Sequence, residues 1–180
     1  AEQDGFLSAL HLWSALAAIS FKAADKESDA QIVLRRVTNG SASASAPTLK
    51  TGVGSETTNA APTQVSIRID TSVFGLGPIG APSSPNSFSA GNGYVYNTLV
   101  HEVGHALGLG HGGPYNNGDN LGTFPDRQLG VYDSRLWSIM SYINANDTTA
   151  KFFGDYPVTG TAWGNLNSTT PMMLDILAIQ

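Results

Sequence analysis

The chain contains no cysteine among its 180 residues. This absence excludes disulfide scaffolds, thiolate metal sites and thiol nucleophiles. A bound metal ion must therefore be held by histidine, carboxylate or backbone oxygen atoms. Histidine is itself scarce, with 4 in the chain, and three of these lie close together in the sequence, at His101, His105 and His111.

Charged residues are also scarce, at 13% of the chain, about half of the usual proportion. The 9 Lys and Arg residues against 14 Asp and Glu residues give a net charge of −5, and no basic stripe could neutralise phosphates. We therefore expect no nucleic-acid partner. No apolar run is long enough to cross a bilayer, so we expect no membrane span.

The N-terminal residues follow a helical period. Residues 5–19 place large side chains on one face, and Asp4 stands in a suitable position for an N-cap. His11 has no neighbour that would complete a site, so we expect it to be a structural or surface residue. The predicted apolar face consists of Phe6, Leu7, Leu10, Trp13 and Ala17.

Strands are predicted over residues 30–37 and 64–70, the second from strict alternation of apolar and polar residues. Residues 39–59 between them are rich in Ser, Ala, Gly and Thr and could form a long loop or one or two weak strands, for which 48–54 is the best candidate. Residues 75–93 are expected to form a loop.

Two more helices are predicted in the second half of the chain. One begins near residues 96–98 and ends near Leu107, where Gly108 and Gly110 stop it. The other opens at Pro171 and runs to the C-terminus. This order of elements fits an α+β or α/β domain with a mostly parallel sheet.

The strongest motif is HEVGHALGLGH at residues 101–111. His101 and His105 project from one helix face about 6 Å apart, as two ligands of one zinc ion require. Glu102 can reach a metal-bound water without being a ligand. His111 can join them only if the chain turns sharply, which Gly108 permits. Chance alone would produce this pattern with a frequency on the order of a few in a million.

Two other interpretations of the motif were weighed. One is a helix with unrelated histidines. The other is a purely structural zinc site. Three histidine ligands leave a fourth position open beside Glu102, which structural sites rarely do.

The motif resembles the zinc signature of the metzincin metallopeptidases. Ser138–Tyr142, SIMSY, resembles their Met-containing turn and is most similar to the serralysin group of secreted bacterial proteases. Further matches are Asp133–Arg135 and the C-terminal Leu174–Gln180. The resemblance is strongest over residues 94–145 and 171–180.

The resemblance implies an α+β, metzincin-like fold with a twisted, mostly parallel sheet, three main helices and a zinc cleft. It implies one catalytic domain over residues 1–180. About 1–108 would form an N-terminal part that contains the active-site helix. About 109–180 would form a C-terminal part that contains the Met-turn.

The resemblance also implies roles for individual residues. The three histidines of the motif would bind Zn²⁺, and Glu102 would act as general base and then as general acid. Tyr142 would ligate the resting zinc and then donate a hydrogen bond to the tetrahedral intermediate; the alternative is a packed tyrosine. Met140 would form an apolar floor below the metal.

The sequence departs from the serralysin pattern at three places. Gly112 stands where serralysins usually have proline, and Asp175 is the one acid of the last helix where the family often has two. The sequence stops at Gln180, whereas serralysins continue into calcium-binding repeats, so calcium is not assigned by resemblance. Asp119 and Asp126 could bind calcium, but a solvated polar loop is the preferred interpretation.

The predicted function is a zinc-dependent endopeptidase that hydrolyses extended protein substrates through a metal-activated water. The substrate is expected to bind along residues 87–94 and to be selected by a pocket around 140–144. Arg135 is expected to form a structural salt bridge rather than a substrate contact. A non-cutting zinc-containing binding module and a narrow-specificity amidase on the same fold remain as alternatives.

We expect a monomer whose partner is a polypeptide substrate; a protein inhibitor or propeptide is left open as a further partner. By resemblance the protein is secreted into the extracellular space. The N-terminus lacks the basic and apolar segments of a signal peptide. Export would then depend on a signal already removed or outside this chain.

Overall fold

A computed structural model describes residues 2–38, 42–45, 64–70, 94–115, 124–153 and 167–180. Within these ranges the chain forms three α-helices and one small sheet, which confirms the expected α+β class. The helices are α1 (Glu2–Ala17), α2 (Tyr94–Ala106) and α3 (Met173–Ile179). The strands are β1 (Ile32–Val37), β2 (Ala42–Ala44) and β3 (Val65–Asp70), and two 3₁₀ turns are η1 (Glu27–Asp29) and η2 (Pro125–Arg127).

The sheet is mixed, with β3 between its two neighbours in the order β1-β3-β2. β1 runs parallel to β3, with Ile32 opposite Val65, whereas β2 runs antiparallel to it, with Ala44 opposite Ile67. The expected parallel pairing is therefore confirmed for β1 and β3 only. β2 belongs to the segment in which weak strands were expected, but the favoured stretch 48–54 lies outside the described residues.

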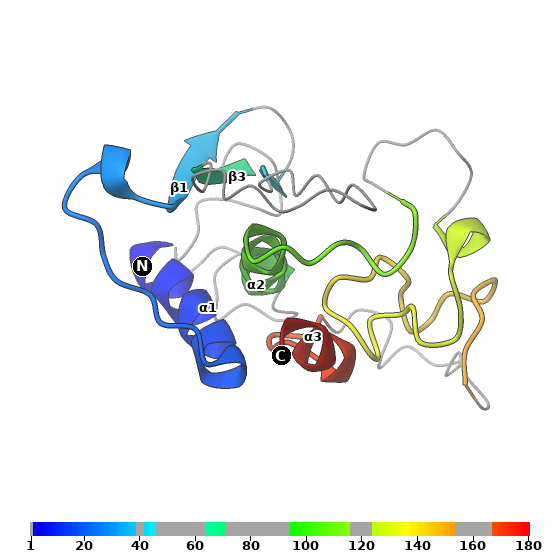
Figure 1. Cartoon of the computed structure of the whole chain (residues 1–180). Helices are drawn as coiled ribbons and strands as arrows, with labels where there is room; N and C mark the ends of the chain where they lie inside the picture. Colours follow the sequence, from blue (N-terminus) through cyan, green and yellow to red (C-terminus); the bar gives the residue numbers. More distant parts are fainter. Residues whose placement is uncertain (1, 39–41, 46–63, 71–93, 116–123, 154–166) are drawn as a thin grey trace, which may run out of the picture.

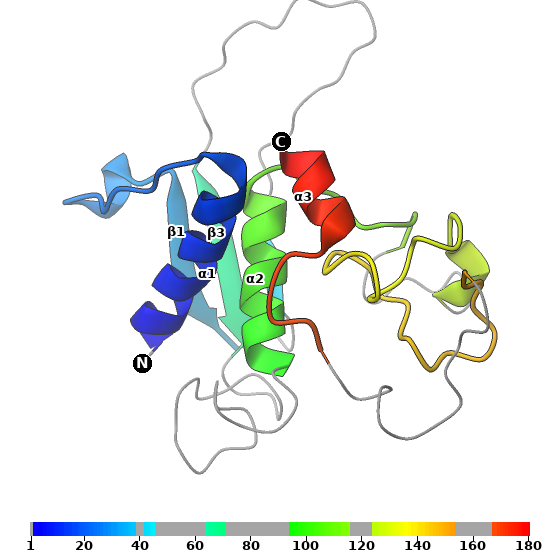
Figure 2. The same cartoon turned by 90° about the horizontal axis from the view of Figure 1, so that it is seen from below.

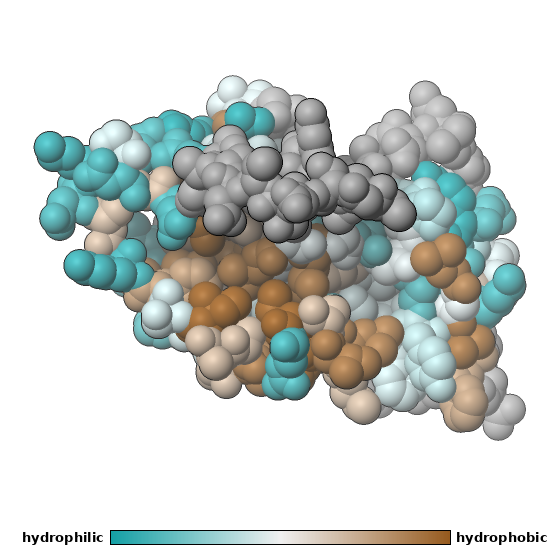
Figure 3. Space-filling view, in the orientation of Figure 1, coloured by the Kyte–Doolittle hydropathy of each residue, from teal (hydrophilic) through white to brown (hydrophobic). Residues whose placement is uncertain are grey.

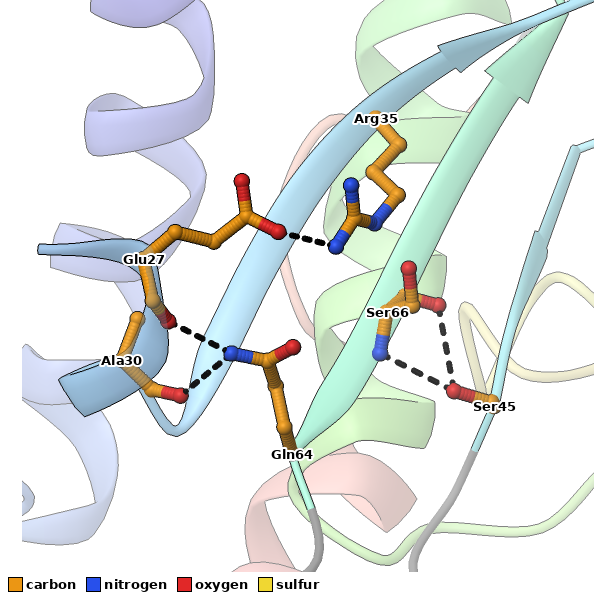
Figure 4. Close-up of polar contacts among 6 residues, drawn as sticks. All are labelled: Glu27, Ala30, Arg35, Ser45, Gln64 and Ser66. Carbon is orange, nitrogen blue, oxygen red and sulfur yellow. Dashed lines mark hydrogen bonds and ion pairs between the residues drawn. The ribbon is translucent and has the colours of Figure 1, made fainter.

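Polar side chains form hydrogen bonds at both edges of the sheet (Figure 4). Gln64, just before β3, donates its side-chain N–H to the carbonyl of Glu27 at 2.7 Å, and the Glu27 carboxylate pairs with Arg35 of β1. At the other edge the N–H of Ser66 donates to Ser45 Oγ at 2.9 Å, and the N–H of Ser45 donates to the Ser66 carbonyl at 3.0 Å. These bonds hold β3 in register with both neighbours.

Helix α2 lies at the centre of the molecule, against the sheet and between α1 and α3 (Figures 1 and 2). It contributes more residues to the hydrophobic core than any other helix or strand of the described chain, because it is covered on several sides. Trp13 of α1 is fully buried and donates its indole N–H to the Val100 carbonyl at 3.0 Å. The core comprises Ala9, Leu10, Trp13, Val65, Ile67, Ile69, Val95, Leu99, Val100, Val103, Ala106, Ile139 and Met140.

Two details of the predicted N-terminal helix are wrong. The helix already includes Glu2, so Asp4 lies inside its first turn and is not the N-cap. Leu7 is 50% exposed, and Ala9 takes the expected place in the core because the buried face is rotated. His11 is exposed, as expected for a surface histidine.

Several large apolar side chains of the helices remain at the surface. Figure 3 shows apolar residues gathered around α1 and α3, where Leu7, Met173 and Leu177 are all at least half exposed. Within the described ranges no helix has both the length and the apolar character that crossing a membrane requires.

Candidate metal centre

The C-terminus of α2 ends in a left-handed turn at Gly108, which has φ of 99°. The Gly108 N–H donates to the His105 carbonyl at 2.9 Å, and the Leu109 N–H donates to the Gly104 carbonyl at 3.0 Å. This pair of bonds is a Schellman motif, in which glycine avoids the strain of positive φ. The predicted stop at Gly108 is confirmed, and the turn brings the following segment back towards the helix.

After this turn the three histidines of the motif lie together, and each Nδ1 bonds a backbone carbonyl. His101 contacts the carbonyl of Ile139 at 2.8 Å, and His105 contacts that of Leu109 at 2.8 Å. His111 contacts the carbonyl of Tyr115 at 2.7 Å. A carbonyl can only accept, so each Nδ1 must carry the proton, and each Nε2 of a neutral ring must be an acceptor.

The three Nε2 atoms therefore point lone pairs into one space. Those of His105 and His111 are only 3.0 Å apart, and Nε2 of His101 is buried with no hydrogen-bond partner in the described part of the chain. One ring nitrogen from each of the three residues lies within 4.8 Å of the others. Two facing lone pairs at this distance repel unless a cation lies between them.

A proton is a poor candidate for that cation. Burial, followed by the neighbouring His105, lowers the pKa of His101 to about 3. Burial, together with the charge of His111, also lowers the pKa of His105. Histidines that bind a metal through one ring nitrogen usually donate the N–H of the other to a carbonyl or carboxylate, as these three do. One tetrahedral zinc ion would place its ligand nitrogens roughly 3.3 Å apart, so the donor set fits such an ion.

Glu102 follows His101 on α2 and is 5% exposed. Its carboxylate accepts a hydrogen bond from the backbone N–H of Ala44 in β2, while its Oε2 is buried and has no hydrogen-bond partner within the described ranges. Burial raises the pKa of Glu102 to about 7 against the opposing effect of the Ala44 bond. A carboxylate with this pKa can both accept and release a proton near neutral pH.

Tyr142 faces the same space from the segment after the Met-containing turn. Its ring centroid lies 4.4 Å from that of His111 and 5.7 Å from that of His101. Met140 is buried and packs so closely on α2 that a Cβ at Gly104 would lie 2.7 Å from its Sδ. The structure thus brings the three predicted histidines and Tyr142 together, with Met140 against the helix that carries His101, Glu102 and His105.

The Met-containing turn is held in place by a carboxylate of α3. Asp175 is 2% exposed and accepts hydrogen bonds from Ser138 Oγ at 2.6 Å and from the Ile139 N–H at 2.7 Å. The N–H of Met172 donates to the same carboxylate at 2.7 Å. Asp175 therefore holds the N–H side of Ile139, the residue whose carbonyl contacts His101.

A second buried carboxylate, Asp133, lies behind His111. Its Oδ1 accepts bonds from the Tyr115 hydroxyl at 2.6 Å and from Ser141 Oγ at 2.8 Å. A Cβ at Gly112 would collide with the same carboxylate, which explains why a larger residue is absent there. The sequence analysis missed Tyr115, and the one available signal was its place four residues after His111.

Other sequence-predicted residues have different outcomes. Arg135 donates to the Ser141 carbonyl at 3.3 Å and to Asn167 Oδ1 at 2.9 Å, which ties two loops together. Asp126 lies in η2, and Asp119 lies outside the described residues. The expected substrate segment 87–94 also lies outside them, except for Tyr94, which begins α2.

Comparison with known proteins shows that part of the chain is similar to metalloproteases. The chain is 39% identical to Metalloprotease AprA of Pseudomonas entomophila (strain L48) over 87 residues, which are 48% of this chain and 16% of that protein. It is 39% identical to Metallopeptidase AprA of Pseudomonas marginalis over 97 residues, 54% of this chain and 19% of that protein.

Serralysin C of Dickeya chrysanthemi is 40% identical over 87 residues, which cover 48% of this chain and 16% of the relative. Each alignment thus covers about half of this chain and less than a fifth of the relative. No protein-family model matches the chain. The chain is similar to serralysin and AprA metalloproteases over this segment.

Proposed function

We propose that the chain contains the catalytic centre of a zinc-dependent endopeptidase similar to the serralysins. The observation that carries this proposal is the convergence of three unprotonated Nε2 atoms, two of them from the helix that also carries Glu102, whose Oε2 is buried with no hydrogen-bond partner among the described residues. The named metalloprotease relatives support the same chemistry. Zinc is the ion we assign, because three histidines with an open fourth position are typical of catalytic zinc.

The proposal includes a metzincin-like catalytic domain over residues 1–180. Its N-terminal part to about residue 108 would supply the helix α2, and its part from about 109 would supply His111 and the Met-turn. The mixed sheet, the turn at Gly108 and the packing of Met140 on α2 support this arrangement. We propose that it acts outside the cell, as the resemblance to secreted serralysins implies, and that it is a monomer.

His101, His105 and His111 would hold the metal, whose chemistry in such a site is Lewis-acid activation of water and of the substrate carbonyl. Glu102 Oε2 would accept the proton of the attacking water and later deliver it to the leaving nitrogen. The Tyr142 hydroxyl would donate a hydrogen bond to the carbonyl oxygen as negative charge develops there. No covalent bond between enzyme and substrate is needed.

An extended substrate is best accommodated next to β2. Among the described strands β2 pairs with β3 alone, and its Ala44 N–H already reaches the carboxylate of Glu102. A peptide added to the other edge of β2 would pass close to the reacting groups. We therefore propose β2, in addition to the expected residues 87–94, as a substrate-binding strand.

The test is digestion of an unfolded protein mixture by the zinc-loaded chain, with Glu102→Gln in parallel and cut sites determined by mass spectrometry. We expect Glu102→Gln to retain one zinc per chain while turnover falls by about 10²–10⁴-fold, the usual effect of losing a general base. Equal cutting by both proteins would remove Glu102 from the mechanism.

An absence of cuts with zinc bound would favour one of two alternatives. A binding module would still retain peptide ligands in both proteins, without turnover in either. A narrow-specificity amidase would cleave short amides, with no gain in kcat/KM as the substrate is lengthened. An extended-cleft endopeptidase should instead gain kcat/KM with each added residue.

A further inference from the structure

Tyr115 lies behind the metal centre and contacts it through three separate groups. Its backbone carbonyl accepts the Nδ1–H of His111 at 2.7 Å. Its hydroxyl accepts the backbone N–H of Tyr142 at 3.2 Å. Its ring stacks on both His111 and Tyr142, with centroid distances of 5.7 and 5.3 Å and interplanar angles of 22° and 27°.

The hydroxyl of Tyr115 is itself held from behind. It donates to Asp133 Oδ1 at 2.6 Å and lies 3.1 Å from Ser141 Oγ, which also donates to Asp133 at 2.8 Å. All three residues are buried, at 1% exposed for Tyr115, 7% for Asp133 and 1% for Ser141. A carboxylate can only accept, so it fixes the direction of both hydroxyl protons. The lone pairs of Tyr115 are thereby turned towards the Tyr142 N–H.

The neighbouring backbone is adapted to this carboxylate. Cβ atoms at Gly112 and Gly113 would collide with Asp133 or with the Tyr115 ring, so the segment after His111 lies directly on the pair. A purely structural tyrosine would need a buried ring and a satisfied hydroxyl. It would not need to contact a metal-ligand histidine with its carbonyl and the next site residue with its hydroxyl.

We infer that Tyr115, oriented by Asp133, is a positioning residue that sets the place of Tyr142 relative to the third histidine. This inference rests on the proposed peptidase function, because Tyr142 would act there as the hydrogen-bond donor to the substrate carbonyl. Tyr115 does not touch substrate. Its hydroxyl acts through the Tyr142 backbone, and its carbonyl acts through His111.

The discriminating variant is Tyr115→Phe, which removes the hydroxyl and keeps both the ring and the carbonyl. We expect kcat to fall about tenfold, in the range found for outer-shell residues, with KM and zinc affinity changed by less than about threefold. In a Tyr142→Phe background the same change should cause no further fall in kcat, because coupled residues are not additive. Additive losses, or an unchanged kcat in the single variant, would overturn the inference.

The matched control is Tyr96→Phe, which removes a hydroxyl bonded to Ser8 at 2.7 Å between α1 and α2, outside the metal centre. We expect it to lower the melting temperature without changing kcat. An equal fall in kcat for Tyr96→Phe and Tyr115→Phe would mean a general structural effect and would overturn the inference.

A readout without activity separates this inference from the proposed function. In zinc-loaded protein the Tyr142 amide should be protected from hydrogen exchange, and Tyr115→Phe should accelerate its exchange about tenfold. If Tyr115→Phe does not fold, Asp133→Asn should accelerate the same amide. An unprotected Tyr142 amide in the wild type, or unchanged exchange in the folded variants, would overturn the inference even if peptides are cleaved. Accelerated exchange in a protein that cleaves no peptide would leave the positioning contact established and would contradict the proposed function.

Discussion

Different kinds of interaction stabilise two regions of the molecule. The sheet, α1 and α2 share an apolar core, in which residues such as Trp13, Ile67 and Leu99 are fully buried. The segment from residue 124 to 153 contains no regular element except η2 (Figure 1). Five of its nine buried residues are polar, and they include Asp133, Ser138 and Ser141.

The difference shows how a loop-rich segment can hold a metal centre. Apolar packing is non-directional and tolerates small shifts, whereas hydrogen bonds to a buried carboxylate fix both distance and direction. Asp133 and Asp175 each accept several such bonds in the second region. Between them they position the carbonyl partners of His111 and His101, so the site spans both regions.

The largest expected contrast compares Leu99→Ala with Asp175→Asn. Leu99→Ala should lower the free energy of unfolding by about 2–5 kcal/mol through loss of packing and should leave zinc affinity nearly unchanged. Asp175→Asn should cost about 1–3 kcal/mol and should also weaken zinc binding about tenfold, because the Ile139 carbonyl would lose its support. Denaturant titration and chelator competition measure the two quantities. Equal effects of both variants on zinc affinity would contradict the distinction between the two regions.

A smaller effect is expected at the junction of the two regions. Gly108→Ala should cost about 1–2 kcal/mol, because alanine is strained at a φ of 99° although nothing lies within 4 Å of the added Cβ. Zinc affinity should fall with it, since the turn brings His111 back to the helix. Gly110→Ala, which also meets nothing within 4 Å, is the matched control and should change neither quantity. Similar losses in both variants would show that the turn tolerates a side chain.

The smallest expected effect is a dependence of the free energy of unfolding on alkaline pH, which arises at Tyr115, the partner of Asp133. Burial, reinforced by the Asp133 bond, raises the pKa of Tyr115 from 10.0 to about 12. The folded state then holds this proton more tightly than the unfolded chain, so the stabilisation is complete below pH 10 and is lost as the pH rises through 12. The free energies of unfolding of the wild type and of Tyr115→Phe should therefore differ less at pH 12 than at pH 9. A constant difference would remove Tyr115 as the source.

Local patterns in the sequence were enough to predict the three helices, β1 and β3, and the grouping of the three histidines. Strict alternation identified β3, and the histidine spacing on a helix that ends at Gly108 identified the centre. Both predictions depend on residues within about ten positions of each other in the sequence. The wrong N-cap at Asp4 and the exposed Leu7 reflect a short amphipathic helix whose buried face is chosen by its neighbours.

Only the tertiary structure decided what holds each histidine and which tyrosines surround them. Tyr115, Asp133 and Asp175 lie up to several tens of residues from the groups they orient, and no local periodicity connects them. Their roles depend on hydrogen-bond direction, which exists only once the chain has folded. The sequence by itself therefore determined the chemistry available at the centre, whereas the tertiary structure decided the geometry in which that chemistry is held.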